Sequence, residues 1–73
     1  MAYNSLSLAE RMRALADGGH PRAEELRAKA ADFDRKTAHH YSPAGGSESA
    51  KAMLGAWARA RKLWCECTGE PLV

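Results

Sequence analysis

The chain has no isoleucine, and its one valine is the final residue, Val73. β-Branched and aromatic side chains are the ones that pack well on a pleated sheet, so their scarcity argues against a fold built from strands. Alanine instead supplies nearly half of the apolar positions, and many of the remaining residues are leucine, arginine, lysine and glutamate. These residues lose least on entering a helix. The composition therefore predicts an all-α fold.

Long apolar runs are also missing. No stretch approaches the ~20 apolar residues that a membrane-spanning helix needs, and residues 1–5 lack the basic and then apolar pattern of a secretory signal. We therefore expect a soluble, cytoplasmic protein without a membrane partner. Cys65 and Cys67 are separated by one residue. Successive helical side chains point about 100° apart, so we expect two free thiols, as in a reducing compartment.

The charge of the chain is small. The net charge is +2 and the isoelectric point is about 8.7, with both signs interspersed along the sequence. A dedicated nucleic-acid-binding domain usually has an isoelectric point above about 9 and clusters its basic residues. The charge pattern therefore disfavours nucleic acid as a partner and is typical of an ordinary solvated surface.

A chain of 73 residues forms one domain at most, and its core is thin. Burial of one large apolar side chain stabilises by about 1.5–3 kcal/mol, whereas ordering one residue costs about 1.5 kcal/mol. We therefore expect a second copy of the chain or a permanent protein partner to supply further burial, and the sequence leaves open which. The large apolar residues are Leu6, Leu8, Met12, Leu15, Leu26, Phe33, Met53, Leu54, Trp57, Leu63, Trp64 and Leu72, with Tyr3 and Tyr41 at the margins.

Capping residues predict three helices, at about 8–17, 21–40 and 48–68. Ser7 and Glu10 fit a capping box at the start of the first helix, and Gly18 follows its end. Pro21 suits the first turn of the second helix. Ser47 suits the N-cap of the third, which ends before Gly69. We expect the two longer helices to form an antiparallel hairpin with the short helix packed across it, like a three-helix bundle.

Each long helix has an apolar stripe with spacings of three and four residues, which predicts the buried face. In the second helix the stripe is Ala23, Leu26, Ala30, Phe33, Thr37 and then His40 or Tyr41. In the third helix it is Ala50, Met53, Trp57, Ala60, Trp64 and Cys67, widened by Leu54 and Leu63.

Two tryptophans, Trp57 and Trp64, are seven residues apart and so lie on one face of the third helix. Tryptophan is enriched at the energetic centres of protein interfaces. The plainer interpretation is that both rings belong to the core while the basic residues Arg59, Arg61 and Lys62 are solvated. Because rings and cations point to different faces, the stretch is poorly arranged for nucleic acid.

His39, His40, Cys65 and Cys67 are the one conceivable set of metal ligands. A hairpin would separate the two histidines from the two cysteines by most of a helix, so we predict no metal site and no cofactor. His20 could approach the cysteines, but neither an orienting third group nor a glycine-rich loop accompanies it. We predict no catalytic residue and expect that the protein is not an enzyme.

The leading hypothesis is a small protein–protein interaction module: an adaptor, an inhibitor or a regulatory subunit. One form of this hypothesis is a phage or mobile-element protein that blocks a host protein. Its predicted contact residues are Trp57, Trp64, Arg61 and Met53, with Phe33 and Leu26 opposing them. The alternative is a small DNA- or RNA-binding regulator that uses the basic face of the third helix or the turn between the first two helices. Glu24 and Glu25, just after that turn, would meet phosphates badly.

Overall fold

The computed structural model describes residues 7–70, which form three helices: α1 (Leu8–Asp17), α2 (Ala23–His40) and α3 (Ser47–Thr68). No strand occurs in this range. The prediction of an all-α fold is therefore confirmed. Tyr3, Leu6 and Leu72, which the sequence analysis counts among the large apolar side chains, lie outside the described residues.

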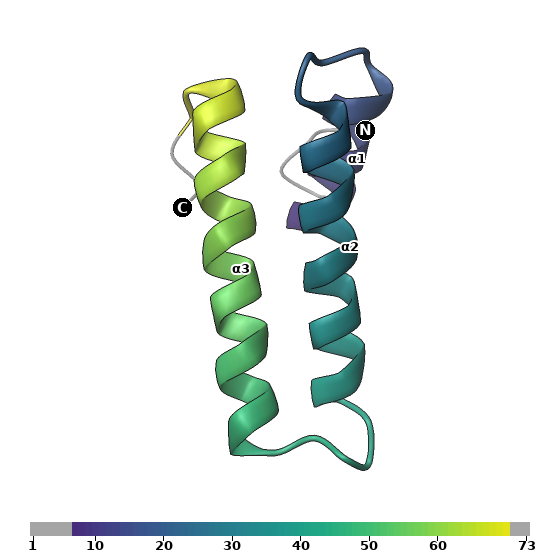
Figure 1. Cartoon of the computed structure of the whole chain (residues 1–73), viewed down its shortest axis with the longest axis vertical. Helices are drawn as coiled ribbons and strands as arrows, with labels where there is room; N and C mark the ends of the chain where they lie inside the picture. Colours follow the sequence, from purple (N-terminus) through teal and green to yellow (C-terminus); the bar gives the residue numbers. More distant parts are fainter. Residues whose placement is uncertain (1–6, 71–73) are drawn as a thin grey trace.

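The two long helices lie side by side as an antiparallel hairpin, and α1 covers only part of it (Figure 1). α3 has 22 residues and is about 33 Å long, whereas α1 has 10 residues and is about 15 Å long. α1 packs where α2 begins and α3 ends. We call this part the covered half, which comprises residues 23–32 and 58–68. The open half comprises residues 33–41 and 47–57, and no third helix of the described chain lies over it.

The start of α1 is a complete capping box. The Ser7 hydroxyl accepts a hydrogen bond from the Glu10 amide, and the Ser7 amide donates to the Glu10 carboxylate, both at 3.3 Å. The helix ends at Asp17, and Gly19 turns the chain with a φ of 92°, a left-handed conformation that glycine adopts without strain. The bounds of α1 coincide with the predicted 8–17.

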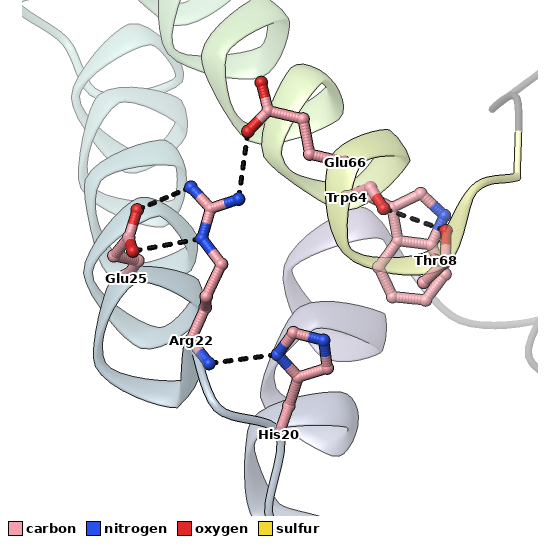
Figure 2. A network of polar contacts seen from close by, with 6 residues as sticks. All are labelled: His20, Arg22, Glu25, Trp64, Glu66 and Thr68. Atoms are coloured by element: carbon pink, nitrogen blue, oxygen red, sulfur yellow. Dashed lines mark hydrogen bonds and ion pairs between the residues drawn. The ribbon is translucent and has the colours of Figure 1, made fainter.

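α2 begins at Ala23, two residues later than predicted. Pro21 and Arg22 belong to a preceding turn, in which the Ala23 amide donates to the His20 carbonyl at 3.0 Å. The His20 imidazole accepts from the Arg22 amide at 3.0 Å (Figure 2). Because the turn holds Arg22 at a φ of −103° and a ψ of 32°, the first helical hydrogen bond runs from Leu26 to Arg22.

A polar clip closes the hairpin at the loop. Gly46, not Ser47 as predicted, is the N-cap of α3, and its amide donates to the Ser49 hydroxyl at 2.7 Å. The same hydroxyl lies 2.8 Å from the Gly46 carbonyl and 3.0 Å from Nδ1 of His40, the last residue of α2. The N-cap lies at Gly46 because Ser49, three residues later, accepts a hydrogen bond from the Gly46 amide, which has no partner within the helix.

The main cluster of buried apolar side chains lies in the covered half beneath α1, whereas Ala56 is buried in the open half outside this cluster. The cluster consists of Leu8, Ala9, Met12, Ala16, Leu26, Ala30, Ala60, Leu63 and Trp64. Each helix contributes at least one alanine, which lets the neighbouring helices approach closely, and the larger side chains fill the remaining space. Met12 and Leu26 are completely buried. Thus α1 is what converts this half of the hairpin into a three-sided core.

Ion pairs link the helices around this core. Arg13 of α1 pairs with Asp34 at 2.6 Å, and Asp17 pairs with Arg27 at 2.8 Å. Arg22 joins the two long helices, because it contacts Glu66 at 3.0 Å as well as Glu25 (Figure 2). Exposed pairs of this kind are each worth about 1 kcal/mol or less. They orient α1 and the hairpin, whereas the apolar cluster supplies most of the stabilisation.

The difference between the two halves predicts unequal costs for the same truncation. Met12→Ala opens a cavity in the closed core and should lower the free energy of unfolding by about 2–5 kcal/mol. Met53→Ala, in the open half, should cost less than half as much, because Met53 is already partly exposed. Chemical denaturation of dilute protein, followed by circular dichroism, measures both. Equal losses would contradict this division of the core.

Candidate protein-interaction groove

The two tryptophans lie on the same face of α3 but differ in burial. Trp64 is 2% exposed, whereas Trp57 is 37% exposed. Their sequence surroundings are alike, since seven residues is close to two helical turns. The difference arises because α1 lies over the part of this face that carries Trp64 and stops short of the part that carries Trp57.

The open half contains an apolar groove between α2 and α3 with a volume of about 360 Å³. Its lining residues are Phe33, Thr37, Tyr41, Met53, Leu54 and Trp57. On the α2 side they recur every fourth residue, ending at the residue after the helix, and on α3 they lie within residues 53–57. Two of them stand out from the surface, since Tyr41 is 77% and Leu54 is 61% exposed. The groove thus has one wall from each long helix, and each wall ends in a protruding side chain.

The floor of the groove is continuous with the core. Phe33 is partly buried and packs against the core cluster of the covered half. Met53 is also partly buried, from the α3 side. The groove is therefore the continuation of the interhelical core beyond the end of α1, in the position that a longer third helix would fill.

Thr37 places a hydroxyl in this apolar setting. Its Oγ1 is buried and has no hydrogen-bond partner among the described residues. A buried hydroxyl left unsatisfied costs about 1–3 kcal/mol. The unpaired Thr37 hydroxyl therefore lowers the stability of the fold.

The walls of the groove are positioned by ring contacts. The Arg61 guanidinium lies 5.7 Å from the centroid of the Trp57 ring, within the range of a cation–π interaction. The Tyr41 ring packs edge-on against His40 at 4.9 Å, and His40 is part of the clip that closes the loop. The Trp57 ring is thus held by a residue of the same helix, and the Tyr41 ring by the residue that precedes it.

The structure brings together four of the six predicted contact residues. Phe33, Met53 and Trp57 line the groove, and Arg61 stacks beside it. The other two, Leu26 and Trp64, are buried in the core beneath α1 and offer no surface to a partner.

Sequence reasoning missed Thr37, Tyr41 and Leu54 as site residues. A signal for the first two was present, because positions four apart share one face of a helix. The predicted apolar stripe of the third helix includes Leu54, but this side chain faces outward.

Two of the basic residues considered for nucleic-acid binding, Arg59 and Arg61, contact a carboxylate and a ring of the same chain. Arg59 lies 3.5 Å from Asp32, which also contacts Arg35 at 2.7 Å and Lys36 at 3.3 Å. Burial alone would raise the pKa of Asp32. The hydrogen bond and charge of Lys36, with further contributions from Arg59 and Arg35, outweigh it and lower the pKa below its usual value.

The candidate metal ligands, two histidines at the end of α2 and two cysteines at the end of α3, are far apart along the hairpin. His40 lies at the loop with Ser49, whereas Cys65 and Cys67 are in the last turn of α3. Both thiols are free and partly exposed. Within residues 7–70, no three His, Cys, Asp or Glu side chains gather in a way that could hold a metal ion.

A second hollow, of about 540 Å³, lies along the outside of α3 and the two residues after it. Its lining residues are Ala58, Arg61, Lys62, Cys65, Glu66, Gly69 and Glu70. Because its walls come from one helix and carry several charged side chains, it is a shallow, solvated depression. The smaller groove between α2 and α3 is the better candidate, since two helices form it and apolar side chains line it.

None of the three helices in the described range has the length and apolarity needed to cross a membrane. Comparison of the chain with known protein families, with curated proteins and with solved structures finds no match.

The unpartnered hydroxyl predicts that Thr37→Val is tolerated. The change removes a buried polar atom that forms no bond and keeps the shape of the side chain, so the free energy of unfolding should stay the same or rise by up to about 1 kcal/mol. Thr68→Val is the matched control, because its hydroxyl donates to the Trp64 carbonyl at 2.8 Å and accepts from Glu70. The Thr68→Val variant should lose about 0.5–1.5 kcal/mol of its free energy of unfolding. If Thr37→Val costs as much as the control, Thr37 has a partner.

The lowered pKa of Asp32 predicts that its carboxylate contributes to the free energy of unfolding in a pH-dependent way. Its folded pKa lies below the unfolded value of about 3.9, so the ionised form stabilises the fold above that pH, and the contribution is lost as the pH falls through the folded pKa. Asp32→Asn should therefore destabilise by up to about 1 kcal/mol at pH 7 and match the wild type at the acid end. Denaturation curves at several pH values test this. A difference that persists unchanged in acid would contradict it.

Proposed function

We propose that this protein is a non-enzymatic protein–protein association module, such as an adaptor, an inhibitor or a regulatory subunit, and that it binds through the groove of the open half. The observation that carries the proposal is the contrast between the two tryptophans. Trp64 is covered by α1, and Trp57, two turns earlier on the same face, is left partly exposed beside Tyr41 and Leu54. An exposed cluster of large apolar side chains on a small domain marks a binding surface.

The composition of the groove supports binding in preference to chemistry. Its lining is apolar except for the hydroxyls of Thr37 and Tyr41, and neither a carboxylate nor an imidazole nor a thiol is part of it. Tryptophan and tyrosine are enriched where protein interfaces draw most of their energy, since each ring covers a large area at low entropic cost. A groove between two antiparallel helices is the usual receptor for a third helix.

The position of Arg61 fits the same function. Its guanidinium rests over Trp57 at the edge of the groove, as charged groups do at the polar rim of an interface. No observation on the described residues favours the nucleic-acid alternative over this one, since Arg13 and Arg59 face carboxylates of this same chain.

Site-specific crosslinking in the source cell tests the proposal. Leu54 is replaced by a photo-crosslinking phenylalanine analogue, and the same analogue is placed at Ala52, which is exposed on another face of α3 and lies outside the groove. Illumination should join position 54 to another polypeptide chain, and position 52 should yield at least about tenfold less adduct.

When Tyr41→Glu, on the opposite wall of the groove, is added to the chain that carries the crosslinker at position 54, the adduct should disappear. Circular dichroism of each variant shows whether the fold is kept. A folded protein that gives no adduct from position 54, or equal adducts from both positions, would refute the groove as a binding surface.

A further inference from the structure

We infer that the groove of the open half receives an amphipathic helix of another protein, and that this helix carries acidic residues along the side that faces α3. The inference rests on the proposed function and names the chemistry of the partner that the same site binds. Three features of the molecule support it: the way α1 packs on the other half of the hairpin, the cations along the α3 side of the groove, and the different charge balance of the α2 side.

The covered half shows how a helix packs on this hairpin. α1 lies against α2 and α3 through Leu8, Met12 and Ala16, which are spaced four residues apart and are all buried. The groove continues the same interhelical core, with Phe33 and Met53 at its floor. A helix with apolar side chains at spacings of three and four residues therefore fits the groove in the same way, as in other complexes in which a helix occupies an apolar groove.

The α3 rim of the groove is a line of exposed residues with a cation at each end. It consists of Lys51, Leu54, Ala58 and Arg61. Their spacings of three, four and three residues place them on one side of the helix. Leu54 lines the groove, and Arg61 lies over the Trp57 ring. The α3 rim thus has a cation before and a cation after its exposed leucine, about 15 Å apart along the helix axis.

No carboxylate of α3 lies among these cations. Between Glu48 and Glu66, the helix contains four arginines and lysines and no acidic residue. Glu66 pairs with Arg22 at 3.0 Å, and Lys51 forms no ion pair within residues 7–70. The positive charge of the α3 rim therefore favours a partner that brings carboxylates to this side of the groove.

The α2 rim differs from the α3 rim because its charge is balanced. The corresponding line of exposed residues is Asp34, Ala38 and Tyr41, at spacings of four and three residues. The Asp34 carboxylate pairs with Arg13 of α1 at 2.6 Å, so it meets its cation within the chain. A bound helix is therefore expected to turn its acidic side toward α3 and an uncharged side toward α2. This difference between the rims fixes the rotation of the bound helix about its own axis.

The positive charge of the whole chain gathers around the groove. Residues 32–62, which include both rims, contain six arginines and lysines and three acidic residues, whereas the rest of the chain contains five and six. A surplus of one sign beside a binding site speeds the approach of an oppositely charged partner. Nucleic acid is the poorer match, because single strands stack their bases on aromatic rings and the Arg61 guanidinium already lies over the Trp57 ring.

Two matched peptides test this inference. Both are stapled helices of about four turns with leucines at spacings of three and four residues. Along one flank of the leucine stripe, the first peptide carries glutamates and the second carries lysines. Fluorescence anisotropy of each labelled peptide, titrated with the full chain at about 50 mM salt, measures the two dissociation constants. The glutamate peptide should bind at least about tenfold more tightly than the lysine peptide, and the difference should shrink at about 0.5 M salt.

Charge reversal on the α3 rim supplies the matched variants. Lys51→Glu combined with Arg61→Glu should invert the order, so that the lysine peptide binds more tightly, a result that loss of folding cannot produce. Lys29→Glu combined with Lys62→Glu makes the same change in net charge outside the groove lining and should keep the wild-type order. Leu54→Glu should weaken binding of the glutamate peptide at least about tenfold, and circular dichroism reports whether each variant is folded.

Three results would overturn the acidic helix as the occupant: a glutamate peptide that binds no more tightly than the lysine peptide, a folded reversed variant that keeps the wild-type order, or tighter binding of a labelled oligonucleotide or a labelled second copy of the chain. If one of these results is obtained while position 54 still crosslinks to another protein in the cell, the association function stands and its partner is not an acidic helix. If neither peptide binding nor crosslinking depends on the groove, both proposals fail.

Discussion

The structure depends on a mismatch of lengths: a third helix that is half as long as the hairpin it covers. Wherever α1 reaches, three helices enclose Met12, Leu26 and Trp64 and exclude water. Past the N-terminal end of α1, helices α2 and α3 continue with the same apolar stripes. No other part of residues 7–70 lies over them there. Two helices touch along one line and cannot enclose a core, so the large side chains of the open half remain partly exposed.

Alanine strengthens this constraint. Alanines from all three helices let the backbones approach closely in the covered half, but each buries little surface. The stability of the fold therefore rests on a few large side chains under α1, and no surplus is available to close the other half. The clip of His40, Ser49 and Gly46 holds the two helices together at the loop. It fixes the groove in place without covering it.

Much of the fold could be predicted from local signals. The capping box of Ser7 and Glu10, the glycines after α1 and α3 and the stripe of α2 all act over a few residues, so the sequence reveals them. The start of α2 was misplaced because the turn around His20 competes with the proline signal. Burial was harder to predict. Trp57 and Trp64 have the same period and similar neighbours, and Leu26 belongs to the same stripe as Phe33. Which of them is covered depends on where α1 ends in space, which is a tertiary property.

Hydrogen exchange of the backbone amides tests this account most directly, because local opening reports how well each segment is enclosed. In dilute protein, the amides of residues 33–40 and 50–57 should exchange about 10–100-fold faster than those of residues 27–32 and 58–66, although all lie in the same two helices. Equal protection along the whole length of α2 and α3 would show that the open half is as well enclosed as the half beneath α1, and would contradict the account.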